Sequence, residues 1–569
     1  MKRKHLLWIT LLLLTLACRV TLPRPPSIAT PLPLPLATDT PAPPSPTPTP
    51  TLTPTPAPTA TPLPQPPALL ADDVLLFPAP PCPGDWLSAD VTPLLPPGDA
   101  PYTVTLALPS GEVTTARVVP HHFDDTLRAR FYWTGPLPES AAAITFTLEV
   151  PPHVADPNAE DNVAVIPLAA CGPHPLPPEP QATWATTETA GFRLHYLTES
   201  AAERDLAELL AKAQSAYRAV TAKIGATDDP LDIYFLSRVI GQGGYAAGDW
   251  VAISYLDRNY APGNIEMVLR HELVHWVDDA IGCKGAPSIV REGLAVMGAG
   301  GHYWPVPPEQ QAAALLGTEA WIPLAVLAVD FYTHQHEIGY AEAGALLAYA
   351  REAHGWDGIA AFCRATSAEP DGPVAQMAAG APALGYADLD ALEVAWMAWL
   401  AAFDVSPEMR AQLAADVRLM DTMRAYQLRF DPTAHFLRAI LFNPRAGAER
   451  GVVADFVRRP RTLDAVALEV LLVKAQDAAA RRDAAAVDAL LDVIEATLAD
   501  GFPAQGLAAD ARGITAAALA RGYEPYRMEA LAEGGYRVHA VSLDAWPQRE
   551  QFVARYTAHR WDIQIEEAR

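Results

Sequence analysis

The sequence predicts a multidomain protein with mixed α and β structure. We expect a small β-sandwich at residues 69–175, an α+β domain at 182–404 and a mainly α-helical domain at 405–569. The chain has 569 residues, whereas one domain usually holds about 100–200. Apolar residues alternate with polar ones early in the chain and recur at helical spacing later. The 57 prolines are unevenly distributed and are densest in two linker-like stretches, 19–68 and 173–180.

Charge and composition exclude two classes of protein. Lys and Arg total 41 and Asp and Glu total 66, which gives a net charge of −25 at pH 7. A chain this acidic is expected to bind neither nucleic acid in general nor a membrane surface through basic residues. Hydrophobic residues make up 50% of the chain, which excludes a wholly disordered protein.

Residues 1–18 are expected to form a lipoprotein-type signal peptide. A basic start, Lys2–Lys4, precedes an apolar run, Leu6–Leu16, that is too short to span a bilayer. The segment Leu14–Cys18 resembles the processing box of bacterial lipoproteins, which implies that Cys18 carries the lipid. We therefore expect export to a bacterial cell envelope, with a lipid anchor in a membrane and the protein facing outward. Ordinary secretion with cleavage nearby is the alternative.

A stalk is expected to follow the anchor. Residues 19–68 are rich in Pro, Thr and Ala and carry almost no charge. Because proline removes backbone donors, this tract favours an extended, disordered polyproline II spacer. At ~3.1 Å per residue it would reach on the order of 100–150 Å.

Four further cysteines are consistent with an exported protein. Cys82 and Cys171 fall in the first predicted domain, and Cys283 and Cys363 fall in the second. We favour disulfides within each pair. Other pairings and four free thiols remain open, because four cysteines allow three connectivities.

The β-sandwich is predicted from short alternating segments. Strands are expected at Tyr102–Leu108, Arg128–Trp133, Ala143–Val150 and Val163–Leu168. The turn Pro157–Asn162 resembles the strand-joining turn of bacterial Ig-like surface modules. Such a module is typically a spacer or a binding platform.

The α+β domain begins after the second proline-rich stretch. Strands are expected at Gly191–Tyr196, Leu231–Leu236 and Trp250–Tyr255, and helices at Ala201–Ile224 and Asn264–Ile281.

The last domain is rich in Ala, Leu and Arg. Helices are expected at Ala465–Arg482 and Ala484–Leu498, and the tail Tyr523–Ile565 is expected to return to β structure.

One helix carries a motif with metal chemistry. His271 and His275 are four residues apart, so both imidazoles lie on one helix face and can bind one ion. Zinc accepts such nitrogens at ~2.0–2.1 Å. Glu272 lies beside the first histidine. It suffices as a general base because zinc lowers the pKa of a water to roughly 7. We therefore expect one Zn²⁺ ion per chain.

A third ligand is expected on the next helix. Glu292 lies in the stretch Pro287–Ala295, with 16 residues between it and His275, which leaves room for a turn and a returning helix. Gly293 removes a side chain beside Glu292 and lets the two helices approach each other.

These residues resemble the gluzincin metallopeptidases, in particular the bacterial peptidase-MA-like families. The resemblance covers about residues 185–404 and includes Gly243–Ala246 before the motif. It implies a His271, His275 and Glu292 ligand set with Glu272 as general base. It also implies that Trp250–Tyr255 is an edge strand that pairs with a substrate peptide.

The sequence also departs from these families. The aminopeptidase signature Gly-x-Met-Glu-Asn is absent, which favours an endopeptidase. Thermolysin-like enzymes have an acidic residue where this chain has Val296, so Asp278 or Asp279 is a candidate support for the ligands. Tyr340 is the candidate oxyanion stabiliser, and its competitors are His334, His336 and Tyr332.

Two polar clusters are interpreted without a chemical role. His121–Asp125 is expected to be an exposed polar loop, with metal binding as the alternative. The pair Asp278–Asp279 is otherwise expected to be a solvated helix face, with a calcium site as the alternative.

The sequence thus predicts a zinc-dependent hydrolase that cleaves peptide bonds at the cell surface or in the periplasm. Two alternatives remain. One is an inactive surface binding or scaffold protein with the same fold. The other is a hydrolase of a non-peptide amide bond in the cell wall.

Overall fold

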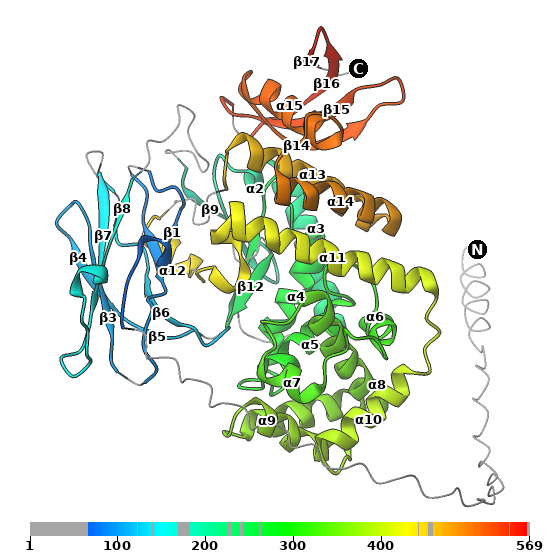
Figure 1. Ribbon diagram of the computed structural model, residues 1–569. Coiled ribbons are helices and arrows are strands. Elements are labelled where there is room, and N and C mark those ends of the chain that lie inside the picture. Colours follow the sequence, from blue (N-terminus) through cyan, green and yellow to red (C-terminus); the bar gives the residue numbers. More distant parts are fainter. Residues whose placement is uncertain are drawn as a thin grey trace, which may run out of the picture. The chain divides into compact units, whose positions relative to one another are not determined.

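The computed structural model describes most of the chain (Figure 1). It covers residues 66–565 except 83, 99, 122, 136, 139–141, 169–181, 226–229, 239–242, 262, 442, 453–458 and 546. The predicted signal peptide with Cys18, most of the proline-rich stalk, and Cys171 lie outside the described residues. The described part is multidomain, with several sheets and about 14 helices.

The first folded part is the expected sandwich of two antiparallel sheets, and each predicted strand is present. One sheet has the order β1 (Val74–Phe77), β2 (Ser88–Val91), β6 (Leu127–Phe131), β5 (Val119–Pro120). The other has the order β4 (Val113–Arg117), β3 (Thr103–Ala107), β7 (Ala143–Glu149), β8 (Val163–Pro167). Alternate residues of both sheets meet in one core, where Phe131 contacts Phe146 with ring centroids 5.8 Å apart.

A five-stranded sheet forms the base of the α+β part. Its order is β12 (Gly244–Ala247), β13 (Trp250–Ser254), β11 (Asp232–Leu236), β10 (Arg193–Leu197), β9 (Trp184–Glu188). The expectation that Trp250–Tyr255 is an edge strand is wrong. β13 lies between β11 and β12, and all five of its residues are buried, as is usual for a strand paired with a parallel neighbour. The edge strand is the short, glycine-containing β12, which runs antiparallel to β13.

Helices follow the sheet in an order that brings three of them together. The helices of this part are α2 (Ala201–Arg204), α3 (Leu206–Lys223), α4 (Ile265–Asp278), α5 (Ser288–Ala299), α6 (Pro308–Leu315), α7 (Leu324–Val329), α8 (His336–Ala368), α9 (Pro373–Gly380) and α10 (Leu389–Leu400). α4 packs against β12 and β13 on one side and against α5 on the other, and α5 packs against α8. The site described below lies where β12, α4 and α5 meet.

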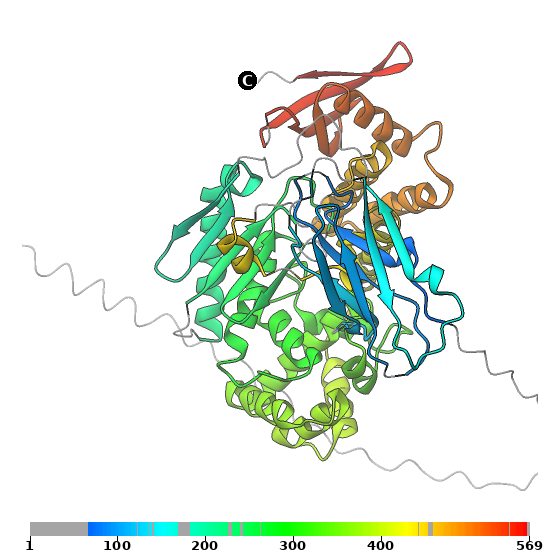
Figure 2. The ribbon, with the colours of Figure 1, turned by 90° about the vertical axis from the view of Figure 1, so that its left-hand side faces the viewer.

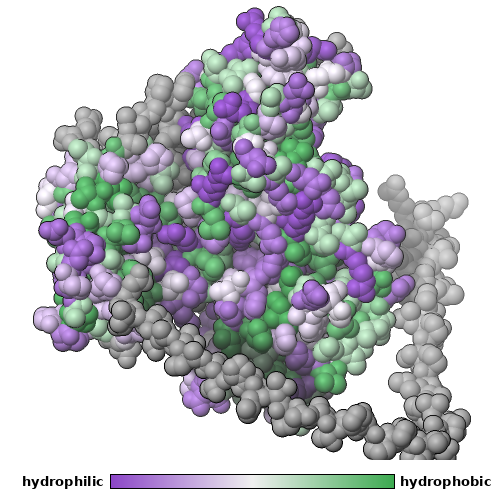
Figure 3. Space-filling model, viewed as in Figure 1, coloured by the Kyte–Doolittle hydropathy of each residue, from purple (hydrophilic) through white to green (hydrophobic). Residues whose placement is uncertain are grey.

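The C-terminal part contains helices and the predicted return to β structure. It comprises α11 (Pro407–Phe430), α12 (Pro444–Glu449), α13 (Leu463–Ala480), α14 (Ala484–Asp500), α15 (Leu507–Leu519), β14 (Tyr523–Ala530), β15 (Tyr536–Ser542), β16 (Arg549–Thr557) and β17 (Arg560–Ile565). The four strands form a meander that packs on α13 and α15 (Figure 2). Hydrophilic residues gather over the helical layer of this part (Figure 3), where Arg418 bonds Asp492 and Glu495.

The three folded parts share cores. Tyr234 and Trp250 on one face of the five-stranded sheet pack in a cluster with Phe77 and Trp133 of the sandwich and Ile440 of the C-terminal part. Residues 64–569 accordingly form one compact unit. Within the described residues, no helix has the length and apolar character needed to cross a membrane.

Candidate metal centre

α4 presents the two histidines of the motif to one point. The helix begins after Asn264, whose side chain accepts a hydrogen bond from the backbone N–H of Met267 and so caps the first turn. His271 and His275 follow on one face, with ring centroids 5.1 Å apart. Buried apolar residues on both sides of the motif hold the helix against the sheet.

α5 brings Glu292 to the same point. The Oε2 atom of Glu292 lies 3.1 Å from Nε2 of His271 and 3.4 Å from Nε2 of His275. Ligands at ~2.0–2.2 Å from a tetrahedral ion lie about 3.3–3.6 Å from one another. The three side chains could therefore hold a metal ion, since their ligand atoms all lie within 4.8 Å of one another.

Two glycines set the position of α5. A Cβ atom on Gly293 would lie 2.4 Å from the backbone oxygen of Ala343 in α8, and one on Gly298 would lie 2.5 Å from the side chain of Val274 in α4. The sequence predicted that Gly293 lets α5 approach the motif helix, α4. In the structure Gly293 instead lets α5 approach α8, and Gly298 is the glycine that lets α5 approach α4.

Tyr332 holds the other oxygen of Glu292. Its hydroxyl donates to Oε1 at 2.8 Å, which leaves Oε2 facing the histidines. Burial alone would raise the pKa of Glu292, but His275 and His271 hold it well below the usual range. The carboxylate is therefore ionised, as a metal ligand must be.

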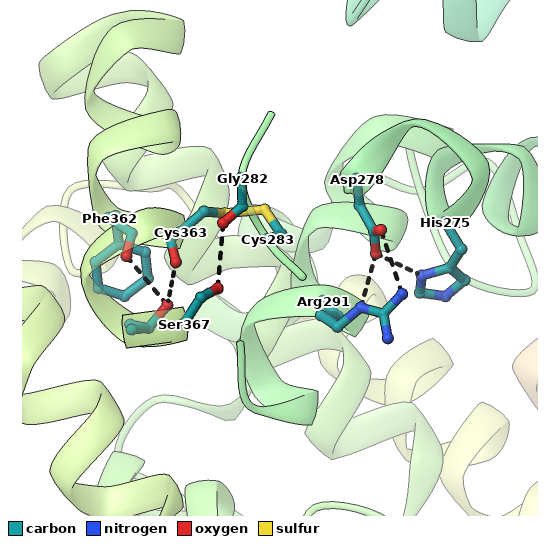
Figure 4. The surroundings of a disulfide bond; sticks show 9 residues. His275, Asp278, Gly282, Cys283, Arg291, Phe362, Cys363 and Ser367 are labelled. Atoms are coloured by element: carbon teal, nitrogen blue, oxygen red, sulfur yellow. Dashed lines mark hydrogen bonds and ion pairs between the residues drawn. A yellow bond between two sulfur atoms is a disulfide. The ribbon is translucent and has the colours of Figure 1, made fainter. Parts of the chain in front are cut away.

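Asp278 supports His275 from the end of α4 (Figure 4). Its Oδ2 atom lies 3.3 Å from Nδ1 of His275 and accepts from Nε of Arg291 at 2.8 Å. The side chain is completely buried, so the interpretation as a solvated face is wrong for Asp278, although Asp279 is exposed. A carboxylate on the second nitrogen fixes the ring orientation and raises its basicity toward a metal. Asp278 thus provides the carboxylate beside a histidine of the motif that the apolar side chain of Val296 cannot provide.

A disulfide lies next to this support. Cys283, just after α4, is bonded to Cys363 in α8, which is the favoured pairing. The hydroxyl of Ser367 also donates to the backbone oxygen of Gly282 (Figure 4). These links tie the end of the motif helix to α8. The partner proposed for Cys82, Cys171, lies outside the described residues.

Glu272 faces the open side of the site. It lines two adjoining cavities of about 70 and 300 Å³, and both also contain His271 and Gly244. A Cβ atom on Gly244 would lie 2.9 Å from Ala252 O and 3.0 Å from Cγ of Glu272, so glycine lets the edge strand approach the carboxylate. Burial raises the pKa of Glu272, which suits a group that accepts and returns a proton near neutral pH.

Tyr340 also lines both cavities. Its ring lies 6.0 Å from that of His271 and stacks on His302 at 4.1 Å. Burial raises the pKa of its phenol well above 10, so the hydroxyl stays protonated and can donate. Of its competitors, His336 lines the smaller cavity and Tyr332 the larger one.

Some residues at the cavities were not predicted. His302 and Tyr303 follow α5, and Arg424 and Phe436 come from the C-terminal part. The Gly-Gly turn at the end of α5 is the sequence pattern that could have pointed to His302. No local sequence pattern points to Arg424 or Phe436.

The sandwich also reaches the larger cavity. Phe123 lines it and contacts Tyr332 and Phe436, with ring centroids 4.8 and 4.7 Å away. The expected exposed loop at His121–Asp125 is therefore wrong in part. His121 is 3% exposed and lies 3.1 Å from Asp124, which also pairs with Arg128.

Comparison with known proteins adds no assignment. No protein-family model matches this chain, and no curated protein matches it significantly.

Proposed function

We propose that this protein is a zinc-dependent peptidase of the gluzincin type, an endopeptidase that acts outside the cell from a lipid anchor at Cys18. The observation that carries the proposal is the convergence of His271, His275 and Glu292 beside Glu272, in a cleft bordered by an edge strand. The distances from Oε2 of Glu292 to the two histidine nitrogens, 3.1 and 3.4 Å, are near the spacing of ligands around tetrahedral zinc.

The side chains divide the chemistry among themselves. A bound Zn²⁺ ion would polarise the substrate carbonyl and acidify a water. Glu272 takes the proton of that water and passes it to the leaving amine. The water oxygen bonds to the carbonyl carbon, Tyr340 donates to the oxyanion that develops on the carbonyl oxygen, and the C–N bond then breaks. Asp278 and Tyr332 keep His275 and Glu292 in their orientations.

The edge strand gives a way to bind an extended chain. Among the described strands β12 pairs on one side only, with β13, and its residues line both cavities. A peptide can add to such an edge through main-chain hydrogen bonds, which places its carbonyl groups along the ligand triad.

The test separates metal binding from catalysis. The purified full chain is dialysed and its zinc content measured, and hydrolysis of a quenched-peptide library is then followed. We expect about one zinc per chain, lost in His275→Ala. Glu272→Gln should keep the zinc and lose about 10²–10⁴-fold in rate.

Glu266→Gln is the matched control, because Glu266 lies on the same helix and bonds Ser215 away from the cavities. Full activity in Glu272→Gln would refute the role of Glu272. A folded protein that takes up no zinc would refute the metal site.

A further inference from the structure

The smaller cavity is lined by an arginine, Arg424, that forms no ion pair with a carboxylate of the described residues. Arg424 projects from α11 into the space that His271 and Glu272 also line. Its Nη1 donates to Oε1 of Gln427 at 2.8 Å, and its Nη2 lies 3.4 Å from Nδ1 of His336.

Other arginines of this chain are paired differently. Arg418, on the same helix, bonds three carboxylates, those of Asp488, Asp492 and Glu495. Within the part of the chain that the structure describes, no ion pair joins Arg424 to a carboxylate, although Asp421 lies near enough to act on it. Arginine keeps its charge at neutral pH. An unbalanced positive charge therefore faces the cavity.

Glu272 supplies the one carboxylate among the described residues that line this cavity, and no ion pair joins it to Arg424. Burial and the nearby charge of Arg424 lower the pKa of His336 well below the usual range, so this ring is uncharged at neutral pH. Tyr303 is also uncharged, because burial raises the pKa of its phenol. His336 and Tyr303 thus offer neutral donors and acceptors beside the guanidinium of Arg424, which suits an anionic group of a ligand.

The edge strand indicates which end of a substrate reaches this cavity. Gly243, just before β12, lines only the smaller cavity, Gly244 lines both, and Tyr245 and Ala246, further along, line only the larger one. An antiparallel chain is the slightly more stable addition to a strand. Such a chain would run from the larger cavity to the smaller one, so residues after the cut bond would lie beside Arg424.

We propose that Arg424 binds a carboxylate of the substrate on the C-terminal side of the bond that is cut. The proposal rests on the peptidase function above and specifies its substrate class. A planar guanidinium matches a carboxylate through two parallel N–H···O bonds. Two sources share this chemistry, the free C-terminus of a peptide and an acidic side chain within a longer chain. The proposal also assigns α11 a role in substrate binding.

The experiment compares four peptidyl hydroxamates in which the hydroxamate replaces the cut bond and two residues follow it. The first ends in a carboxylate and the second in the matching carboxamide. The third carries Glu with an amide end and the fourth carries Gln with the same end. Dissociation constants are measured by titration calorimetry for the zinc-loaded full chain and for Arg424→Gln, Arg424→Lys and Arg429→Gln. Arg429, one turn further along α11, is exposed and is the matched control.

We expect the parent protein to prefer one charged probe over its neutral partner by about 10- to 100-fold. Arg424→Gln should abolish that preference without weakening the neutral probe, Arg424→Lys should keep part of it, and Arg429→Gln should keep all of it. A preference for the free carboxylate identifies chain ends as the substrate, and a preference for Glu identifies acidic residues.

Equal binding of charged and neutral probes by the parent protein would overturn the proposal. Equal weakening of all four probes in Arg424→Gln would also overturn it, because the arginine would then be structural. Zinc content is measured in parallel, so a protein without zinc refutes the peptidase function separately. In that case the same peptides without the hydroxamate still report the preference at Arg424.

Discussion

Replacing Gly293 by alanine tests whether the contact between two helices sets the metal site. Gly293 follows Glu292 directly and faces the backbone of α8. The added Cβ atom would lie 2.4 Å from the oxygen of Ala343, 2.8 Å from its carbonyl carbon and 2.9 Å from Cδ2 of Leu347. Two of these three atoms belong to the backbone of a helix, so no side-chain rotation relieves the clash.

The distances determine the size of the effect. Moving the oxygen contact from 2.4 Å to an ordinary 3.4 Å or more requires a shift of about 1.0 Å between α5 and α8. Overpacking of this kind lowers the free energy of unfolding by about 1–3 kcal/mol. Because alanine has a higher helix propensity than glycine, about 1 kcal/mol of this loss is offset. Metal ligands tolerate about 0.2 Å, so we expect zinc affinity to fall by about 10- to 100-fold, as for loss of a supporting group.

The assay is competition with a chromogenic chelator, with thermal unfolding followed in parallel. Gly339→Ala is the matched control, because this glycine lies in α8 and the nearest atom to its added Cβ would be the flexible end of Leu327 at 3.3 Å, with Phe331 at an ordinary 3.9 Å. That variant should bind zinc like the parent. If Gly293→Ala binds zinc with unchanged affinity, the position of Glu292 does not depend on the α5–α8 contact.

Three further predictions concern the surroundings of the site. Asp278→Asn removes the carboxylate charge beside Nδ1 of His275 and should lower zinc affinity about 10- to 100-fold in the same competition assay. Unchanged affinity would show that Asp278 does not support His275 as a metal ligand. Burial raises the pKa of Glu337 from 4.5 to about 8, so the folded state binds this proton more tightly than the unfolded chain. The free energy of unfolding should therefore fall by up to about 5 kcal/mol as the pH rises from 4.5 to 8. Denaturant titrations of Glu337→Gln should show a smaller change of this free energy over the same pH range. Replacing both Cys283 and Cys363 by serine opens a loop of sequence separation 80, which should cost about 4–5 kcal/mol of stability; a thermal scan equal to that of the parent would contradict this.

The helices of the site could be predicted because their chemistry is local. Two histidines four residues apart define one helix face, and the structure has that helix at α4, which begins after its cap residue Asn264. The spacing to Glu292 likewise leaves room for one turn and one returning helix. The two ligand-bearing segments are close in sequence, so periodicity and loop length were sufficient.

The outer wall of the cleft could not be predicted because it depends on contacts between distant segments. Phe123 comes from the sandwich, and Arg424 and Phe436 come from beyond the α+β part. The edge strand was misplaced for a related reason. β12 is short and contains glycine, and only its pairing with β13 and its contact with Glu272 make it a strand of the site.

The distribution of polar groups suggests that the cleft is shaped for binding more than for stability. The Nδ1 atom of His271 is buried without a hydrogen bond from the described residues, and such an atom costs about 1–3 kcal/mol. Arg424 adds a charge in the smaller cavity, where its described partners are the neutral side chains of Gln427 and His336. By contrast, the buried Arg258 pairs with the carboxylate of Glu469. Beside the ligand triad and the edge strand, a bound ion would hold the three ligands together and a bound anionic peptide would pair with Arg424.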